Sequence, residues 1–348
     1  MKNAIKNRAL WAALGAGWLL QHASGSENAA LFELPAAVMD SVVIVQGSEG
    51  RGSGFLMRDG SNVYLYSNLH VLSGNRALSF TDNSGRNHRV TGIECALDRD
   101  LVRMTLQQPP KMALTLARSI PVNTPIAVCG NAGGEEIFRP VYGTVLGTGP
   151  KKVETDAKFI PGHSGSPMVT KDGAVVGVAT YLIRANPNWT DTNSPFTVTR
   201  RIGCRIDTVP SWLVVSQQWF MTESRWLRTH EQKLQWVLAV VEAWGEDPLG
   251  DPLPCEEKLP KDLLSWVKAH NEMVMRLAQV AGTAKAPVAI KELASDAQQM
   301  RKAIGRTLDA QPLRWHLSQF KEEWADMEQT RSMLDKAIGR MVATAQSL

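Results

Sequence analysis

The most constraining feature of this sequence is a series of short, strand-like segments between about residue 31 and residue 206. Each segment is apolar and rich in β-branched residues, and Gly, Asn and Asp turns separate it from the next. The turn Arg58-Asp59-Gly60-Ser61 lies between two apolar runs, which is a hairpin signal. This pattern predicts an all-β barrel or sandwich. The predicted strands are 41–46, 52–57, 63–67, 78–80, 90–93, 101–104, 125–129, 141–146 and 174–179.

After about Pro210 the sequence changes in character, because glycine becomes scarce and apolar residues recur at helical spacing. Trp212 and Val215 begin this apolar stripe. The segment 245–260 interrupts it with Pro, Gly and acidic residues. Prolines then stand where helices begin, at Pro260, Pro287 and Pro312. The region therefore predicts a bundle of about four helices, with its tryptophans in the core or at an interface.

The first residues have the pattern of a secretory signal peptide. Basic residues precede an apolar run over 9–20, and small residues follow at 23–26. An uncleaved anchor or an amphipathic first helix is the alternative, but the run is shorter than the roughly 20 residues of a membrane span. We therefore expect residues 1–25 to be removed on export. The mature protein is then expected in the periplasm or outside the cell, without a membrane span.

Charge and cysteine patterns exclude several classes of protein. The net charge of +4 is spread along the chain, so nothing indicates a nucleic-acid groove or binding to an anionic membrane. The cysteines form no Cys-x-x-Cys pair and no paired histidines accompany them, so we expect no metal site. Four cysteines allow three full disulfide pairings, which the sequence leaves open, although two of them lie in apolar runs typical of buried thiols. The four are Cys95, Cys129, Cys204 and Cys255.

The segment 155–167 contains a serine between glycines, in Gly162-His163-Ser164-Gly165. Glycine allows close backbone approach and unusual dihedral angles, so such a turn can expose a hydroxyl with backbone N–H groups beside it. That arrangement suits a nucleophile in acyl transfer. The same letters also occur in ordinary loops, so the motif needs support from the rest of the chain.

A nucleophilic serine needs a base within hydrogen-bond reach, and the base needs a carboxylate to orient it. His70 lies at the end of one apolar strand, and Asp100 lies at the head of another. Asp98 is a second carboxylate nearby, but the apolar strand begins directly after Asp100. The order His, Asp, Ser is that of the chymotrypsin class, with separations of 100 − 70 = 30 and 164 − 100 = 64 residues.

Taken together, these segments resemble the trypsin-like serine peptidases of the chymotrypsin fold, and within them the HtrA/Deg-like branch. The resemblance extends in order over roughly residues 35 to 210. The motifs that carry it are Gly52-Ser53-Gly54-Phe55, Ser67-Asn68-Leu69-His70-Val71, Asp100-Leu101-Val102, Gly130-Asn131-Ala132-Gly133, Thr155-Asp156-Ala157, Gly162-His163-Ser164-Gly165 and Ile202-Gly203.

The resemblance implies two six-stranded β-barrels with the active site between them. His70 is then the general base and later the acid, and Asp100 orients it and stabilises the imidazolium. Ser164 is the nucleophile, and the N–H groups of Gly162 and Ser164 form the oxyanion hole. No metal or cofactor is implied.

Two residues beside the serine depart from the family pattern. His163 replaces the usual Asn or Asp, and Ser166 replaces the usual second Gly, as in secreted glutamyl endopeptidases. Neither change removes a member of the triad or an oxyanion N–H. His163 either alters how the loop is held, adds a titrating group beside the site, or points away from it.

Substrate-binding residues are also implied. Lys158 lies six residues before the serine, where the primary specificity pocket of the family begins, and favours acidic side chains. Thr180, Tyr181 and Leu182 are expected to pair with the substrate backbone as an added strand. Asn188-Trp189-Thr190 fits a glycosylation acceptor, for which an ordinary loop is a sufficient explanation.

The C-terminal half departs from the family, because a helical region stands where HtrA-like proteases usually carry PDZ domains. The predicted architecture is β plus α: a chymotrypsin-like double β-barrel followed by a C-terminal helical bundle. The predicted domains are the signal peptide at 1–25, the protease at 26–211 and the helical domain at 212–348.

The predicted function is an exported serine endopeptidase that acts on proteins or peptides. The helical domain is expected to bind a partner, self-associate or regulate. The alternative is an inactive protease-fold scaffold that acts through the helices.

Overall fold

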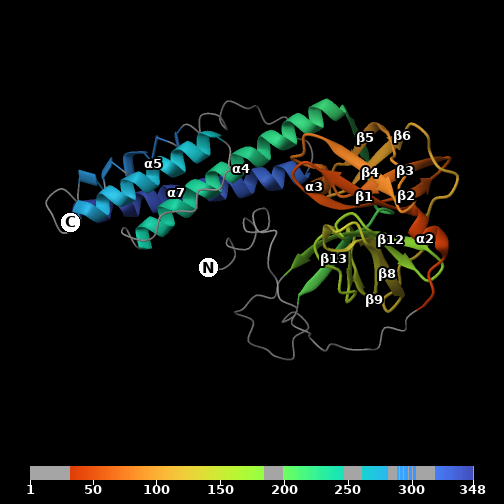
Figure 1. The fold of residues 1–348 in the computed structure, drawn as a ribbon. Coiled ribbons are helices and arrows are strands. Elements are labelled where there is room, and N and C mark those ends of the chain that lie inside the picture. The colour runs from red at the N-terminus through yellow and green to blue at the C-terminus, as the bar shows by residue number, and fades with distance from the viewer. Residues whose placement is uncertain are drawn as a thin grey trace. The chain divides into compact units, whose positions relative to one another are not determined.

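The structure is a computed structural model that describes residues 32–183, 199–246, 261–280, most positions of 288–302, and 318–347 (Figure 1). The predicted signal peptide, the segment 188–190 and Cys255 lie outside the described residues. Two compact units divide the chain. The first contains the described residues up to Arg225 together with 318–320, and the second contains the remaining helical residues.

The first sheet of the β unit has seven antiparallel strands in the order β14-β5-β6-β3-β2-β1-β4. The short helix α2 (Ala36–Ser41) leads into it. The expected hairpin joins β2 to β3, with Asp59 opposite Asn62 and Gly60 between them at φ +59°. The strands are β1 (Val42–Gly47), β2 (Arg51–Asp59), β3 (Asn62–Ser67), β4 (Leu78–Asp82), β5 (Val90–Ala96), β6 (Val102–Leu106) and β14 (Trp212–Val215).

The second sheet closes on itself. Its order is β11-β8-β9-β10-β13-β12-β7, and β11 also pairs with β12, so six antiparallel strands form a closed barrel with β7 added in parallel at its edge (Figure 1). The predicted double-barrel fold is confirmed. The strands are β7 (Thr115–Leu116), β8 (Pro125–Asn131), β9 (Phe138–Thr148), β10 (Lys152–Thr155), β11 (Pro167–Thr170), β12 (Ala174–Ile183) and β13 (Arg200–Cys204).

One apolar cluster joins the two sheets. It contains Phe55 and Tyr66 from the first sheet and Val169 and Val178 from the second, all of them fully buried. A second cluster, which includes Ile126 and Val153, fills the closed barrel. Burial of these apolar side chains holds the two sheets together. The strand ends from which the loops extend are therefore fixed in position.

Three cysteines lie in this β unit as buried free thiols: Cys95, Cys129 and Cys204. Burial raises the pKa of Cys95 and Cys129 to about 12 and that of Cys204 to about 11. The thiols therefore stay protonated near neutral pH, as expected for small buried side chains rather than reactive groups.

The expectation that Trp212 and Val215 begin a helical stripe is wrong. Both residues lie in β14, which pairs with β5 in the first sheet. Their spacing of three residues fits a helix, but the packing of Trp212 favours the strand. The guanidinium of Arg103 lies 4.6 Å from the Tyr64 ring centroid and 4.7 Å from that of Trp212. Arg103 also pairs with Asp59 at 2.7 Å and Glu94 at 2.6 Å.

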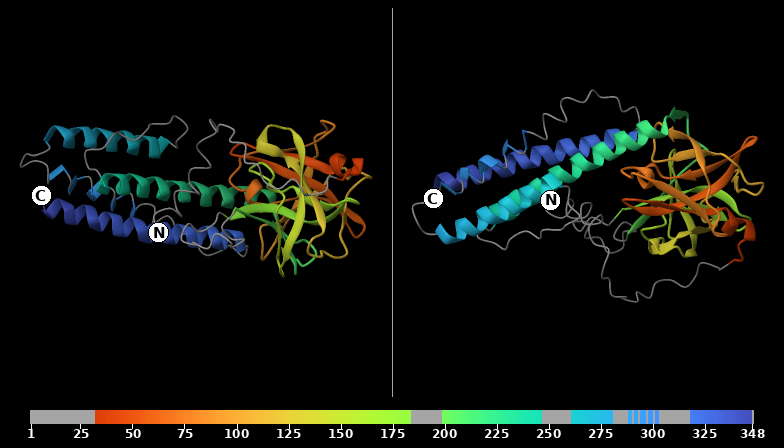
Figure 2. Two further views of the ribbon diagram at one scale, coloured as in Figure 1. Left: turned by 90° about the horizontal axis from the view of Figure 1, so that it is seen from below. Right: turned by 45° about the horizontal axis from the view of Figure 1, so that its top comes forward.

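Long helices follow β14 in the chain. They are α4 (Gln217–Glu246), α5 (Lys261–Val280) and α7 (Ser318–Ser347), and the described positions of 288–302 are also helical. The two views of Figure 2 show α4 and α7 side by side, and Phe220 of α4 stacks on Phe320 of α7 at 5.9 Å. Within the second unit, Leu234 and Leu334 are buried and Arg301 pairs with Asp335. No helix among the described residues is long and apolar enough to cross a membrane.

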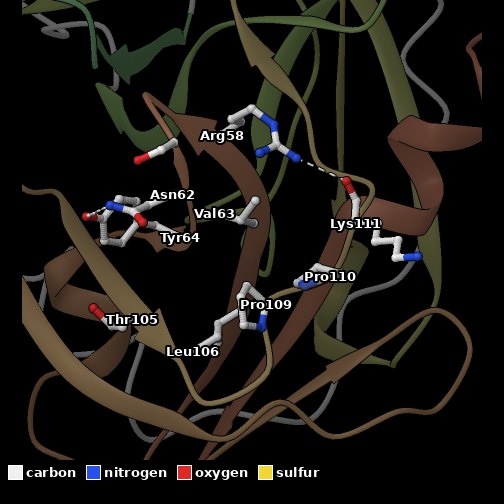
Figure 3. Close-up of a pocket in the computed structure, with 10 residues that line it drawn as sticks. Arg58, Asn62, Val63, Tyr64, Thr105, Leu106, Pro109, Pro110 and Lys111 are labelled. Carbon is white, nitrogen blue, oxygen red and sulfur yellow. Dashed lines mark hydrogen bonds between the residues drawn. The ribbon is translucent and has the colours of Figure 1, made fainter.

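A pocket of about 380 Å³ opens on the first sheet, at the β2–β3 hairpin and the end of β6 (Figure 3). Arg58 lies on its wall and donates a hydrogen bond to the Lys111 carbonyl at 3.1 Å. None of the residues predicted for the active site lines this pocket.

We predict that Arg103→Met lowers the free energy of unfolding by about 2–4 kcal/mol, because it leaves two carboxylates without their partner and removes the stack on Trp212. Urea unfolding of the full chain measures this change. The control is Arg58→Met, an exposed arginine with one hydrogen bond to a carbonyl, for which we expect about 0.5 kcal/mol or less. Equal losses in the two variants would contradict the assigned role of Arg103.

Candidate active site

Four segments carry the predicted site residues: three lie outside the strands, next to a strand end, and the fourth lies within β12. His70 is in α3 (Leu69–Leu72), a single turn of helix directly after β3. Asp100 lies two residues before β6, and Ser164 lies in the loop between β10 and β11. Thr180 is in the second half of β12. All four therefore extend from the rigid sheets of the β unit.

His70 and Asp100 form a close pair. The Nδ1 atom of His70 lies 2.5 Å from Oδ2 of Asp100, and the backbone N–H of His70 donates to Oδ1 at 2.9 Å. The carboxylate thus binds both the ring and the backbone of His70. The other ring nitrogen, Nε2, lies on the opposite edge of the imidazole. Asp98 points elsewhere: it pairs with Arg99 at 2.9 Å and Lys151 at 3.1 Å, and the hydrogen bond from Arg99 lowers its pKa.

Two consecutive β-turns shape the serine loop. The first runs from Ile160 to His163, whose N–H donates to the Ile160 carbonyl at 3.1 Å. Pro161 and Gly162 occupy its centre, and Gly162 has φ +97°, which fits the Pro-Gly preference of a type II turn. The second turn runs from His163 to Ser166, closes at 2.8 Å and has Gly165 at its third position with φ +87°. Residues other than glycine rarely adopt these positive φ angles, so both positions need glycine.

Two backbone N–H groups of this double turn, those of Gly162 and Ser164, donate no hydrogen bond among the described residues. The N–H groups of His163, Gly165 and Ser166 all donate within the protein. Two neighbouring N–H groups that are not used internally are what an oxyanion hole requires.

Ser53 of β2 fastens this loop to the first sheet. Its N–H donates to the Ser164 carbonyl at 2.8 Å, and its hydroxyl donates to the Gly162 carbonyl at 2.8 Å. The same hydroxyl accepts from the N–H of Asn131 at 2.9 Å, and the carbonyl of Ser53 accepts from Ser67 at 2.7 Å. Ser53 is fully buried, so each of these bonds satisfies a polar group that water does not reach.

Asn68 connects the His-Asp pair to the serine. Its Nδ2 atom donates to the Asp100 carbonyl at 2.7 Å and to Oγ1 of Thr180 at 3.1 Å. The carbonyl of Thr180 in turn accepts from the Ser164 hydroxyl at 3.3 Å. Asn68, Asp100, Thr180 and Ser164 are thus joined by hydrogen bonds, although 32 to 112 residues separate the partners of Asn68 from it in the chain.

His163 points into the protein, because only 1% of the residue is exposed. Its Nδ1 atom lies 3.2 Å from the Ile160 carbonyl and its Nε2 atom lies 3.5 Å from the Arg139 carbonyl. Burial lowers the pKa of the imidazole, so the neutral form is favoured. Ser166 is also buried. Its hydroxyl lies against Gly130, where a Cβ would overlap the hydroxyl oxygen, so the glycine leaves room for this serine.

The predicted substrate-binding residues differ in exposure. Lys158 is exposed, Thr180 is buried, Tyr181 is half-buried and Leu182 is 38% exposed. Lys152 lies 5.1 Å from the centroid of the Tyr181 ring. Thr180 acts on its own strand and its neighbours, because its hydroxyl donates to Val178 and accepts from the N–H of Cys204.

Ser53 and Asn68 hold this arrangement together, although the sequence alone assigns them no role. The only sequence signal for them is their place in the motifs Gly-Ser-Gly-Phe and Ser-Asn-x-His-Val. Among the described residues, no group of three or more His, Cys, Asp or Glu side chains is arranged to hold a metal ion.

Comparison with known proteins places this geometry in a family. Residues 52–178 match the model of the trypsin-like peptidase domain. This segment is a trypsin-like peptidase domain. The resemblance to trypsin-like peptidases that the motifs predict is thereby confirmed for this segment, which includes all three residues of the predicted triad.

Two curated proteins with related sequences carry the names of serine proteases. The chain is 27% identical over 145 residues to a probable periplasmic serine endoprotease, DegP-like, of Chlamydia pneumoniae, covering 38% of this chain and 29% of the relative. It is 28% identical over 147 residues to the putative serine protease HhoB of Synechocystis, covering 38% of this chain and 35% of the relative. The chain thus spans about a third of the length of the curated relatives it matches.

Solved structures that match part of the chain include two proteases. The active form of the Rv3671c protease from M. tuberculosis has a TM-score of 0.40 at 15% identity, covering 55% of this chain and 91% of that one. The HtrA-type protease AlgW with a tripeptide has a TM-score of 0.40 at 19% identity, covering 50% of this chain and 59% of that one.

We predict that Ser53→Ala destabilises the peptidase domain by about 1–3 kcal/mol, because it leaves the buried Asn131 N–H and the partly buried Gly162 carbonyl without their partner. Urea unfolding gives the free energy, and hydrogen–deuterium exchange at Asn131 gives the local effect. The matched control is Ser61→Ala, in the exposed β2–β3 turn. Unchanged protection of Asn131 in Ser53→Ala would show that the serine does not hold the loop.

A second prediction concerns pH. The unfolded chain binds a proton at His163 near pH 6.5, whereas burial keeps the folded imidazole neutral to lower pH. The folded state therefore binds fewer protons, and this contribution to stability is present above pH 6.5 and is lost as pH falls. In His163→Asn, the urea midpoint is expected to fall less steeply between about pH 7.5 and pH 5. Identical pH profiles for the variant and the parent would refute this role.

Proposed function

We propose that this protein is an exported serine endopeptidase that hydrolyses peptide bonds through His70, Asp100 and Ser164. The observation that carries the proposal is the set of hydrogen bonds that joins Ser164, Thr180, Asn68 and Asp100, with Asp100 bound in turn to His70. It supports a site assembled from both sheets of the matched peptidase domain. The relatives named above are proteases, although they share only part of their length with this chain.

In this mechanism, Nε2 of His70 accepts the hydroxyl proton of Ser164 while Oγ attacks the substrate carbonyl. Asp100 holds Nδ1–H in place and stabilises the imidazolium that forms, at the 2.5 Å distance of the pair. His70 then returns the proton to the leaving amine, which leaves an acyl-enzyme on Ser164. A water molecule, activated by the same histidine, releases the acid and regenerates the serine.

The N–H groups of Gly162 and Ser164, which the double turn does not use internally, donate hydrogen bonds that stabilise the negative charge on the attacked oxygen. Each such donor typically contributes about 2.7–4 kcal/mol to stabilising the transition state. Ser53 binds the carbonyls of these same two residues and so holds the loop that carries both N–H groups. Ser53 is thus a positioning residue rather than a catalytic one.

The Ser164 hydroxyl has one change to make before attack. It donates to the Thr180 carbonyl at 3.3 Å, and its proton must turn toward His70 when a substrate binds. That 3.3 Å bond is long for a hydroxyl donor, so the rotation costs little. A permanent bond to Thr180 would instead fit an inactive protease-fold scaffold, which is the second candidate function.

The segment 1–25 supports export to the periplasm or the exterior, as does the word periplasmic in the name of the Chlamydia pneumoniae relative. Proteins or peptides are the proposed substrates. We place the peptidase domain within 26–211, extended to Val215 because β14 completes its first sheet. We further propose that the helical region binds a partner, self-associates or regulates the protease.

We predict that a fluorophosphonate probe labels the full-length protein at Ser164, because the probe reacts with a serine whose proton is accepted by a base. Labelling is expected to vanish in Ser164→Ala and to slow by about 10⁴-fold in Asp100→Asn, which turns His70 into the wrong tautomer. Mass spectrometry of the labelled peptide identifies the site.

Ser84→Ala is the matched control, because Ser84 is an exposed serine in the turn after β4 and keeps full labelling. A folded wild-type protein that is never labelled would favour the scaffold function. Labelling of a serine other than Ser164 would contradict the proposed triad.

A further inference from the structure

Arg201 is a half-buried cation without an acidic partner among the described residues. It lies on β13, where its Nε donates to the Phe159 carbonyl at 3.1 Å and its Nη1 donates to the Thr199 carbonyl at 3.4 Å. Burial lowers the pKa of its guanidinium, although Asp156 acts in the opposite direction. A charge that is partly removed from water without a counter-ion is costly, so such an arrangement favours an anion from outside.

Asp156 acts on Arg201 through its charge but forms no ion pair with it. Its carboxylate accepts hydrogen bonds from the N–H of Thr144 at 2.5 Å and from the Thr144 hydroxyl at 3.3 Å. The neighbouring Arg200 is different, because it forms a 2.6 Å ion pair with Glu154. Successive residues of a strand point to opposite faces, so Arg200 and Arg201 serve different sides of β13.

Arg201 also lies between the two segments that flank Ser164. The carbonyl it binds belongs to Phe159, five residues before the serine in the same loop. Across the sheet, Arg201 is paired with Leu182, two residues after the Thr180 that accepts the Ser164 hydroxyl. Cross-strand partners carry their side chains on the same face.

A substrate bound as an extended strand would bring one of its side chains next to Arg201. An extended peptide that pairs along 180–182 and presents a carbonyl to Ser164 must direct the side chain of that same residue between the strand and the serine loop. The side chain of Arg201 reaches the serine loop at Phe159 from a strand that pairs with Leu182, and among the described hydrogen bonds none is donated by its Nη2 group. A planar guanidinium binds a carboxylate with two parallel hydrogen bonds.

We propose that Arg201 makes this site prefer substrates with Asp or Glu at the residue whose carbonyl Ser164 attacks. This inference rests on the proposed endopeptidase function and adds its substrate class. Arg201 is a specificity-determining residue here, and the exposed Lys158, one residue before Phe159, adds positive charge at the same entrance.

The test uses the full-length protein and two fluorogenic peptides that differ only in Glu or Gln at the residue before the scissile bond. These side chains match in size and differ in charge, so the ratio of their kcat/KM values measures recognition of the carboxylate. We expect the Glu peptide to be favoured by about 10- to 100-fold, the range of charged hydrogen bonds. In Arg201→Gln the ratio is expected to fall to near one, and in Arg201→Lys to lie in between.

Arg200→Gln is the matched control, since it removes a neighbouring cation that Glu154 already neutralises, and it is expected to keep the wild-type ratio. A wild-type ratio near one, in protein that a fluorophosphonate labels at Ser164, would overturn the inference and leave the endopeptidase intact. A ratio that survives in Arg201→Gln would overturn it equally. Absence of labelling would instead reject the proposed function on which the inference rests. The wild-type ratio needs no variant, so the inference stays testable even if Arg201→Gln does not fold.

Discussion

The arrangement of the candidate site depends on how the Ser164 loop is held by Ser53. One buried residue of the first sheet binds the carbonyls of Gly162 and Ser164, in the loop that leads into the second sheet. Peptide groups are planar, so the N–H groups of Gly162 and Ser164 are directed by the carbonyls of Pro161 and His163, which share their peptide planes. These carbonyls accept from the N–H groups of Gly133 at 3.0 Å and Ser166 at 2.8 Å. The loop is thereby set before any substrate arrives, which is the condition for electrostatic stabilisation without reorganisation.

The rest of the β unit makes that attachment stable. A shared apolar cluster joins the sheets, and Asn68 adds a polar link between the Asp100 segment and β12. His163 fills the underside of the loop as a buried neutral side chain, so the departure from the family pattern is absorbed in the interior. Arg201 forms no ion pair with a described residue, and its charge is the one proposed to recognise the substrate.

Much of this arrangement could be predicted from local sequence. The strands and the Asp-Gly hairpin follow from apolar runs and turn residues, and Pro161-Gly162 matches the turn that the structure contains. Trp212 and Val215 were misassigned because four residues are too few to distinguish a helical stripe from a strand. Pairing with β5 and the stack on Arg103 decide the outcome there. The roles of Ser53 and Asn68 could not be inferred from spacing, because Gly162 lies 109 residues after Ser53 and Thr180 lies 112 residues after Asn68.

The most direct test of the account is a crystal structure of the protein after reaction with a fluorophosphonate. The account predicts a phosphonyl group on Oγ of Ser164, with its free oxygen accepting hydrogen bonds from the N–H groups of both Gly162 and Ser164 at about 2.7–3.1 Å. The carbonyls of these two residues are expected to remain bound to Ser53. An adduct whose oxygen points away from both N–H groups would contradict the central claim, as would a loop that has left Ser53.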